Sequence, residues 1–64
     1  GHTIAVPDIV REIDGTTEMH VIKLDGDAAT CSWTGSDGKV LRKIVPLASL
    51  IYLRTPGYTV VKDT

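Results

Sequence analysis

The chain has 64 residues, 7 of them basic and 8 acidic, so it fits a single domain with a net charge of −1. That balance argues against a nucleic-acid-binding domain, which at this size is usually clearly basic. The single cysteine excludes an internal disulfide, and the apolar runs are too short and too interrupted to span a membrane. Cys31, His20 and His2 do not make the ligand set of a structural zinc site.

The small size itself points to a partner. A domain of this length buries only about 60% of the surface that its unfolded chain exposes, so its stability is marginal. Small domains compensate with disulfides, metals or partners, and we therefore expect a homo-oligomer, with a different protein partner as another option. The unpaired cysteine suggests a reducing, cytoplasmic setting. We interpret Gly1-His2 as the remnant of an expression tag and expect residues 3–64 to form one domain.

The first predicted strand covers residues 8–13, because Pro7 ends any regular pairing of the short apolar segment before it. Three β-branched residues in this stretch favour a strand over the alternative, a helix capped by Asp8. Residues 14–15 then form a turn. The second predicted strand covers residues 18–24, where Met19 and Val21 share one face. His20 and its neighbour Ile22 share the other face, so this pattern leaves open which face is buried.

A tight turn at residues 25–27 leads into the predicted central strand, residues 28–33. Ala29, Cys31 and Trp33 alternate with Thr30 and Ser32, which predicts one apolar face and one polar face. We expect Trp33 to be the largest piece of the core, because a buried tryptophan hides roughly 200 Å². The predicted core consists of Met19, Val21, Ala29, Cys31, Trp33 and Leu50.

A turn with two glycines at residues 35–38 precedes a fourth predicted strand at residues 40–45, which Pro46 interrupts. Residues 46–50 fit one turn of 3₁₀ helix, and a short strand follows at residues 51–53. Residues 58–61 form a further strand or a tail that pairs with a neighbouring chain. The predicted fold is all-β, a small antiparallel barrel of five or six short strands with one 3₁₀ turn before the last strand. Fold analogy assigns the barrel to the SH3-like type.

Several residues together carry a family resemblance: Pro7-Asp8-Ile9-Val10, Gly15, Met19-His20-Val21, Cys31-Ser32-Trp33 and Leu50. In this combination the chain resembles the YodC-like family of small uncharacterised bacterial proteins over about residues 7–53. Pro7 stands where that family has a glycine, and Ile44 stands where an aromatic residue is usual. The resemblance implies an SH3-like barrel and no established activity.

Residues 43–50, Lys-Ile-Val-Pro-Leu-Ala-Ser-Leu, also resemble the pore-lining strand of the plasmid-borne type II dihydrofolate reductases and the segment after it. In that family SH3-like barrels assemble as tetramers around a central pore, and a Gln-Ile-Tyr triplet before proline holds the pterin and nicotinamide rings. Lys43, Ile44 and Val45 occupy the matching positions. This resemblance implies an alternative function, an oligomeric pore-type reductase in which these three residues line one shared site.

Chemical sites are weakly indicated by the residues themselves. Cys31 with His20 offers a nucleophile and a base, but the alternation around Cys31 favours a buried, unreactive thiol. Carboxylates in turns offer a cation site, but an aspartate beside a glycine is ordinary turn chemistry; they are Asp25, Asp27 and Asp37. The sequence therefore predicts no catalytic residues, no metal site and no cofactor.

A surface with basic and aromatic side chains is the remaining candidate, formed by Lys39, Arg42, Lys43, Tyr52 and Tyr58. Such surfaces bind single-stranded nucleic acid in small barrels, which makes weak nucleic-acid binding a second alternative. A solvated strand edge is the simpler explanation. The preferred function is a non-catalytic binding or self-assembling module, with strand edges and residues 58–61 as docking surfaces.

Overall fold

The computed structural model describes residues 3–57. It contains the strands β1 (Ile9–Glu12), β2 (Met19–Asp25), β3 (Ala28–Thr34), β4 (Val40–Pro46) and β5 (Leu50–Arg54), with a 3₁₀ helix, η1 (Leu47–Ser49), before β5. All pairings in the sheet are antiparallel. The predicted all-β class and the 3₁₀ turn before the last strand are confirmed. The strand predicted at residues 58–61 lies outside the described residues, and no helix in residues 3–57 has the length and apolarity needed to cross a bilayer.

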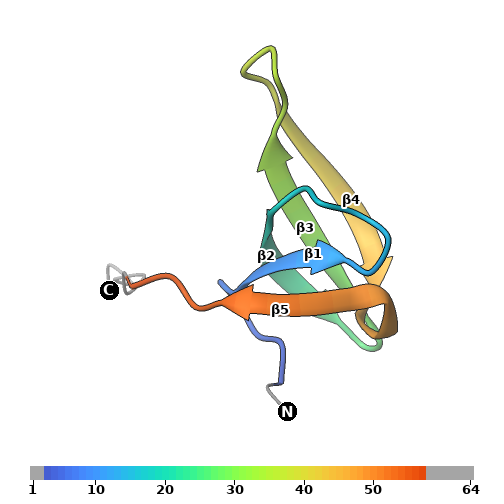
Figure 1. The fold of residues 1–64 in the computed structure, drawn as a ribbon. Coiled ribbons are helices and arrows are strands. Elements are labelled where there is room, and N and C mark those ends of the chain that lie inside the picture. The colour runs from blue at the N-terminus through green and yellow to red at the C-terminus, as the bar shows by residue number, and fades with distance from the viewer. Residues whose placement is uncertain (1–2, 58–64) are drawn as a thin grey trace, which may run out of the picture.

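The strands form one sheet in the order β4-β3-β2-β1-β5. Strands β1 to β4 follow one another as antiparallel neighbours, and β5 returns to pair with β1 (Figure 1). Within residues 3–57 no ladder joins β4 to β5, so the five-stranded sheet does not close between these two strands. The N–H of Ile13 donates to the carbonyl of Ser49 at 3.0 Å, which directs the chain leaving η1 towards β1 and away from β4.

The core lies on the inner face of this curved sheet. Its buried members come from every strand: Val10, Met19, Val21, Ala29, Cys31, Val45 and Leu50. Met19 and Val21 are 2% and 0% exposed, while His20 and Ile22 are exposed. The buried face of β2, which the sequence pattern leaves open, is therefore the face of Met19 and Val21. The β2–β3 ladder shifts register between Val21 and Lys23. This bulge adds Ile22 to the outer surface, where it is 44% exposed.

Trp33 is predicted to be the largest piece of the buried core, but it is not among the buried core residues. It is only partly buried and packs against the core from its rim. Its cross-strand partner is Leu41, which is 44% exposed, because this part of the β3–β4 hairpin extends beyond the other strands (Figure 1). Alternation places the indole on the inner face of the sheet, but at that point the β3–β4 hairpin projects beyond the other strands and, within residues 3–57, no further core residues cover the ring.

Pro46 also differs from its predicted role. It does not interrupt the fourth strand, but belongs to β4 and pairs with Ala28. The next backbone bond runs from the N–H of Leu47 to the carbonyl of Asp27 at 2.7 Å. Bonded and non-bonded pairs alternate in an antiparallel ladder, so Pro46 occupies a position whose missing N–H would point away from β3. An edge strand tolerates proline at such a position.

Asp8 precedes β1 and is not part of it. Its side chain is 3% exposed, and its two carboxylate oxygens accept hydrogen bonds from the N–H of Ala5 and from the hydroxyl of Thr55, each at 2.9 Å. The Thr55 hydroxyl also lies 2.7 Å from that of Tyr52. Because Thr55 gives its one proton to Asp8, the phenol of Tyr52 donates to Thr55. This chain of hydrogen bonds fastens the segment before β1 to the end of β5.

Candidate functional site

The free side of β4 is the candidate functional site. Strand β4 pairs with β3 along its whole length, and among residues 3–57 no strand lies on its other side. At the turn end of this ladder the N–H of Gly35 donates to the carbonyl of Lys39 at 2.8 Å, and at the other end Leu47 donates to Asp27. These bonds fix which pairs are hydrogen-bonded, because the register between them is unbroken.

The backbone groups of β4 therefore divide into two sets. One set bonds to β3: Leu41, Lys43 and Val45. The other set turns its N–H and C=O groups towards the free side: Val40, Arg42 and Ile44. An unpaired row of this kind is a ready template for another strand.

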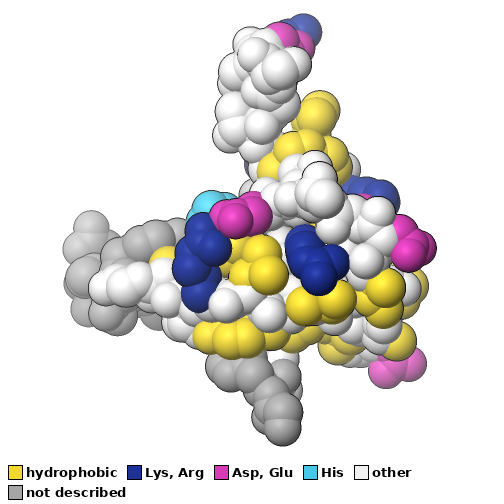
Figure 2. All heavy atoms as spheres, in the orientation of Figure 1, with side chains coloured by type: hydrophobic (Ala, Val, Ile, Leu, Met, Phe, Trp, Pro, Cys, Tyr) yellow, Lys and Arg dark blue, Asp and Glu magenta, His cyan; other side chains and the backbone are white. Residues whose placement is uncertain are grey.

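Side chains on β4 follow the same alternation. Val45 is buried in the core at 2% exposure, and Lys43 is on the same face. Val40 and Ile44 are on the outer face with Arg42, and they are 63% and 72% exposed. Figure 2 shows the hairpin projecting from the body of the protein, with charged side chains at its tip. The free edge therefore presents two large apolar side chains around one cation.

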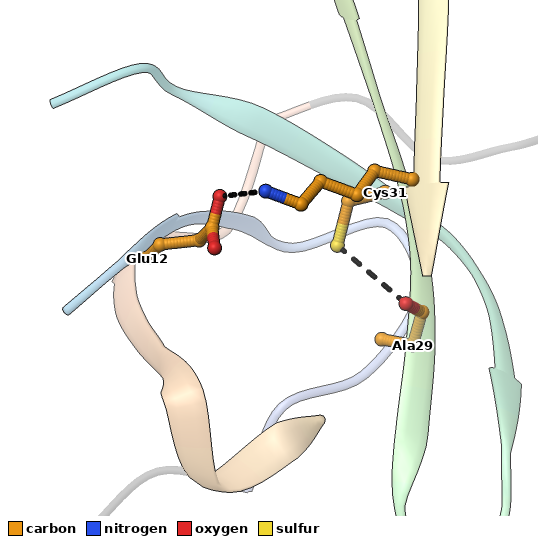
Figure 3. A network of polar contacts seen from close by, with 4 residues as sticks. Glu12, Ala29 and Cys31 are labelled. Atoms are coloured by element: carbon orange, nitrogen blue, oxygen red, sulfur yellow. Dashed lines mark hydrogen bonds and ion pairs between the residues drawn. The ribbon is translucent and has the colours of Figure 1, made fainter. Parts of the chain in front are cut away.

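An ion pair on the inner face links β4 to β1. The Nζ atom of Lys43 lies 2.7 Å from Oε1 of Glu12, beside the Cys31 thiol (Figure 3). Burial raises the pKa of Cys31, the negative charge of Glu12 raises it further, and the Lys43 ammonium acts in the opposite direction. The thiol lies 3.9 Å from the carbonyl of Ala29, a weak contact. A fully buried thiol kept in its neutral form is a poor nucleophile.

Cys31 and His20, which offer a nucleophile and a base in the sequence, are not brought together in the structure. Cys31 is 0% exposed on the inner face, whereas His20 is exposed and pairs with Ser32, the neighbour of Cys31 in β3. Successive residues in a strand point to opposite faces, so the imidazole and the thiol lie on opposite sides of the sheet. The structure does not assemble this pair into a catalytic site.

The predicted basic and aromatic residues are also dispersed. Lys39 is in the hairpin turn, where its N–H donates to the carboxylate of Asp37 at 3.1 Å. Arg42 is on the outer face of β4, and Lys43 is held by its ion pair on the inner face. Tyr52 is on β5, at the other end of the sheet, and Tyr58 lies outside the described residues.

The triplet proposed to line a pore is divided between the two faces of β4. Ile44 is exposed on the outer face, whereas Val45 is buried beneath the sheet and Lys43 bonds to Glu12. Val45 is therefore closed to a ligand or a neighbouring copy, whereas Ile44 and the half-exposed side chain of Lys43 are open to solvent on opposite faces. In residues 3–57 no three histidine, cysteine or acidic side chains come close enough to hold a metal ion.

The sequence does not predict two long-range polar contacts, one between β4 and β1 and one between the end of β5 and the segment before β1. The residues of the Lys43–Glu12 ion pair are 31 apart in the chain, and those of the Thr55–Asp8 hydrogen bond are 47 apart. No local pattern encodes such pairs. The one available signal was Pro7-Asp8, since an aspartate after a proline is a common turn residue that bonds backbone N–H groups.

Comparison of the chain with protein-family models, with curated proteins and with solved structures finds no match.

Proposed function

We propose that this protein is a small, non-catalytic binding module that assembles with a second copy of itself by strand addition along β4. The observation that supports this most directly is the outward row of β4, where Val40, Arg42 and Ile44 offer unpaired backbone groups beside two exposed apolar side chains. We also propose that the fold is of the SH3-like type. Its support is the order of the strands, with β5 returning to β1 after a 3₁₀ turn.

A second copy fits this edge because the outward row matches itself. When two β4 strands lie antiparallel with Arg42 opposite Arg42, Val40 of each copy lies opposite Ile44 of the partner subunit. Residues that face each other in this way point to the same side of the sheet, so each apolar pair buries surface. The outward groups then form about six backbone hydrogen bonds, two for each bonded pair.

The same register places two guanidinium groups opposite each other. Like charges directly opposite in a sheet are unfavourable, so Arg42 weakens the dimer, and salt strengthens it by screening this repulsion. The interface is small and resembles the transient class of contacts, with a dissociation constant of about 10 μM to 1 mM.

The alternative functions receive less support. A pore-type reductase would need Val45, which is 2% exposed, to leave the core. Nucleic-acid binding would need a continuous basic surface with stacking aromatic side chains, and Arg42, Lys43 and Tyr52 lie on different parts of the sheet. The free edge of β4 requires no such rearrangement.

Two substitutions at one position test the proposal. Arg42→Pro removes both the charge and the outward N–H, whereas Arg42→Thr removes the charge and keeps the N–H. Neither touches the ladder to β3, because the N–H of Arg42 points away from that strand. Sedimentation velocity up to about 1 mM should show a weak dimer for the wild type, a stronger one for Arg42→Thr, and a monomer for Arg42→Pro.

Circular dichroism establishes that each variant is folded. If Arg42→Pro does not fold, Ile44→Pro blocks the same edge and takes its place, with Ile44→Thr as its matched control. Monomers for both the wild type and Arg42→Thr throughout this range, or equal dimerisation of the proline and threonine variants, would overturn the proposal.

A further inference from the structure

A shallow depression lies where β1 runs into the loop that leads to β2, bounded on the other side by β5. It has a volume of about 600 Å³ and is lined by Arg11, Ile13, Asp14, Gly15, Thr16, Glu18 and Leu53. This volume is within the range of sites that bind small molecules. Figure 2 shows basic, acidic and hydrophobic side chains close together on the face that carries β1 and β5.

Arg11 is held in place at one side of this depression. Its Nη1 atom donates to three carbonyl oxygens of the chain that follows it, those of Glu12, Ile13 and Gly15, at 3.1, 3.2 and 3.4 Å. Among residues 3–57 the Nε and Nη2 atoms have no hydrogen-bond acceptor. A guanidinium fixed through one nitrogen keeps its other donors for a planar, bidentate contact with a carboxylate.

Two carboxylates line the same depression, and they differ in their partners. Glu18 is paired with the guanidinium of Arg54, whose hydrogen bond and positive charge hold the pKa of Glu18 below its usual value. Asp14 has no ion pair or hydrogen bond from its side chain within the described part of the chain. The depression therefore contains one cation and one carboxylate that are both available to a ligand.

Apolar groups complete the lining. Ile13 is 55% exposed, and Leu53 contributes a partly buried side chain from β5. An exposed isoleucine beside a second apolar side chain offers a small surface that an aliphatic group can cover.

We infer that this depression binds a small zwitterion with an apolar side chain, namely a free α-amino acid of the leucine type. The ligand carboxylate pairs with Arg11, the ammonium group pairs with Asp14, and the side chain covers Ile13 and Leu53. The site is open to solvent, so its two ion pairs are screened and binding is in the millimolar range. This inference does not depend on assembly through β4.

Nuclear magnetic resonance titration of the wild-type protein with L-leucine tests the inference, because chemical shifts report the position and the saturation of weak binding. We expect saturable shifts of the Arg11 Nε–H and of the backbone amides of residues 14–16. N-acetyl-L-leucine lacks the ammonium group and L-leucinamide lacks the carboxylate. Each should bind about fivefold more weakly, since one exposed ion pair is worth up to about this factor.

The matched protein variants are Asp14→Asn, which removes the unpaired carboxylate, and Asp37→Asn, which makes the same change in the β3–β4 turn. Asp14→Asn should weaken leucine binding about fivefold, and Asp37→Asn should leave it unchanged. The inference is wrong if leucine gives no saturable shifts, if either derivative binds as well as leucine, or if Asp14→Asn has no effect.

Discussion

The hydrogen bond from Thr55 to Asp8 makes a specific prediction about stability. Replacement of Thr55 by valine keeps the shape of the side chain and removes the hydroxyl that donates to the Asp8 carboxylate. Asp8 is 3% exposed, so water cannot fully replace the lost donor. The phenol of Tyr52 also loses its acceptor on Thr55.

The magnitude follows from the kind of bond that is lost. A hydrogen bond to a charged group contributes about 1.5–3 kcal/mol. We take the lower end, because Thr55 itself is exposed and the Ala5 N–H still donates to Asp8. Thr55→Val should therefore lower the free energy of unfolding by about 1.5 kcal/mol. For a domain of this size that corresponds to a fall in melting temperature of about 6–12 °C.

Urea and thermal unfolding, followed by circular dichroism, measure this difference. Thr55→Ser is the matched control, because it keeps the hydroxyl, and it should remain within about 0.5 kcal/mol of the wild type. Equal losses for the valine and serine variants would show that the hydroxyl does not stabilise Asp8, and the reasoning would then fail.

Three further predictions concern buried or paired side chains. Val21→Ala should cost about 2 kcal/mol in urea unfolding, because Val21 is 0% exposed and loses two methyl groups; a cost near zero would contradict the description of the core. Arg54→Ala should raise the pKa of Glu18 towards its ordinary value in a carboxyl NMR titration, since the Arg54 hydrogen bond and charge lower it. Burial and the charge of Glu12 raise the pKa of Cys31 in the folded protein. The stability that the neutral thiol provides is therefore fully present below the pKa that Cys31 has in the unfolded chain. It is lost as the pH rises through the pKa that Cys31 has in the folded protein. Cys31→Ala should therefore lose less stability than the wild type in alkaline solution, and parallel pH curves for the two proteins would refute this.

Local patterns predict most of the strands because alternation and turn residues act over short distances. Ala29 and Cys31 are buried as their spacing indicates, and Gly26 and Gly38 adopt φ angles of 59° and 83° in the two hairpin turns. The strand ends are less predictable. Asp8 precedes β1 and accepts hydrogen bonds from Ala5 and Thr55. Pro46 remains in β4 because its missing donor faces the free side.

The course of the sheet and its free edges could not be predicted in the same way. Trp33 has the correct parity for the core, but its burial depends on how far β3 extends beyond its neighbours. The contact between Lys43 and Glu12 joins two strands that do not pair, so it reflects the curvature of the sheet and no periodicity in the sequence. Alternation predicts that Lys43 and Ile44 lie on opposite faces of β4, but it does not predict that Lys43 pairs with Glu12.

Pro46 limits what can grow from the edge of β4. Its ring leaves the last outward position without a donor, so an added chain finds N–H groups at Val40, Arg42 and Ile44 and none at Pro46. When two copies pair symmetrically through this edge, the β4 edge of each copy is covered by the β4 edge of the other. Such a two-fold arrangement closes on itself, whereas a head-to-tail contact propagates into a fibre. In the proposed two-fold dimer, the edge of β4 would therefore be closed to further chains.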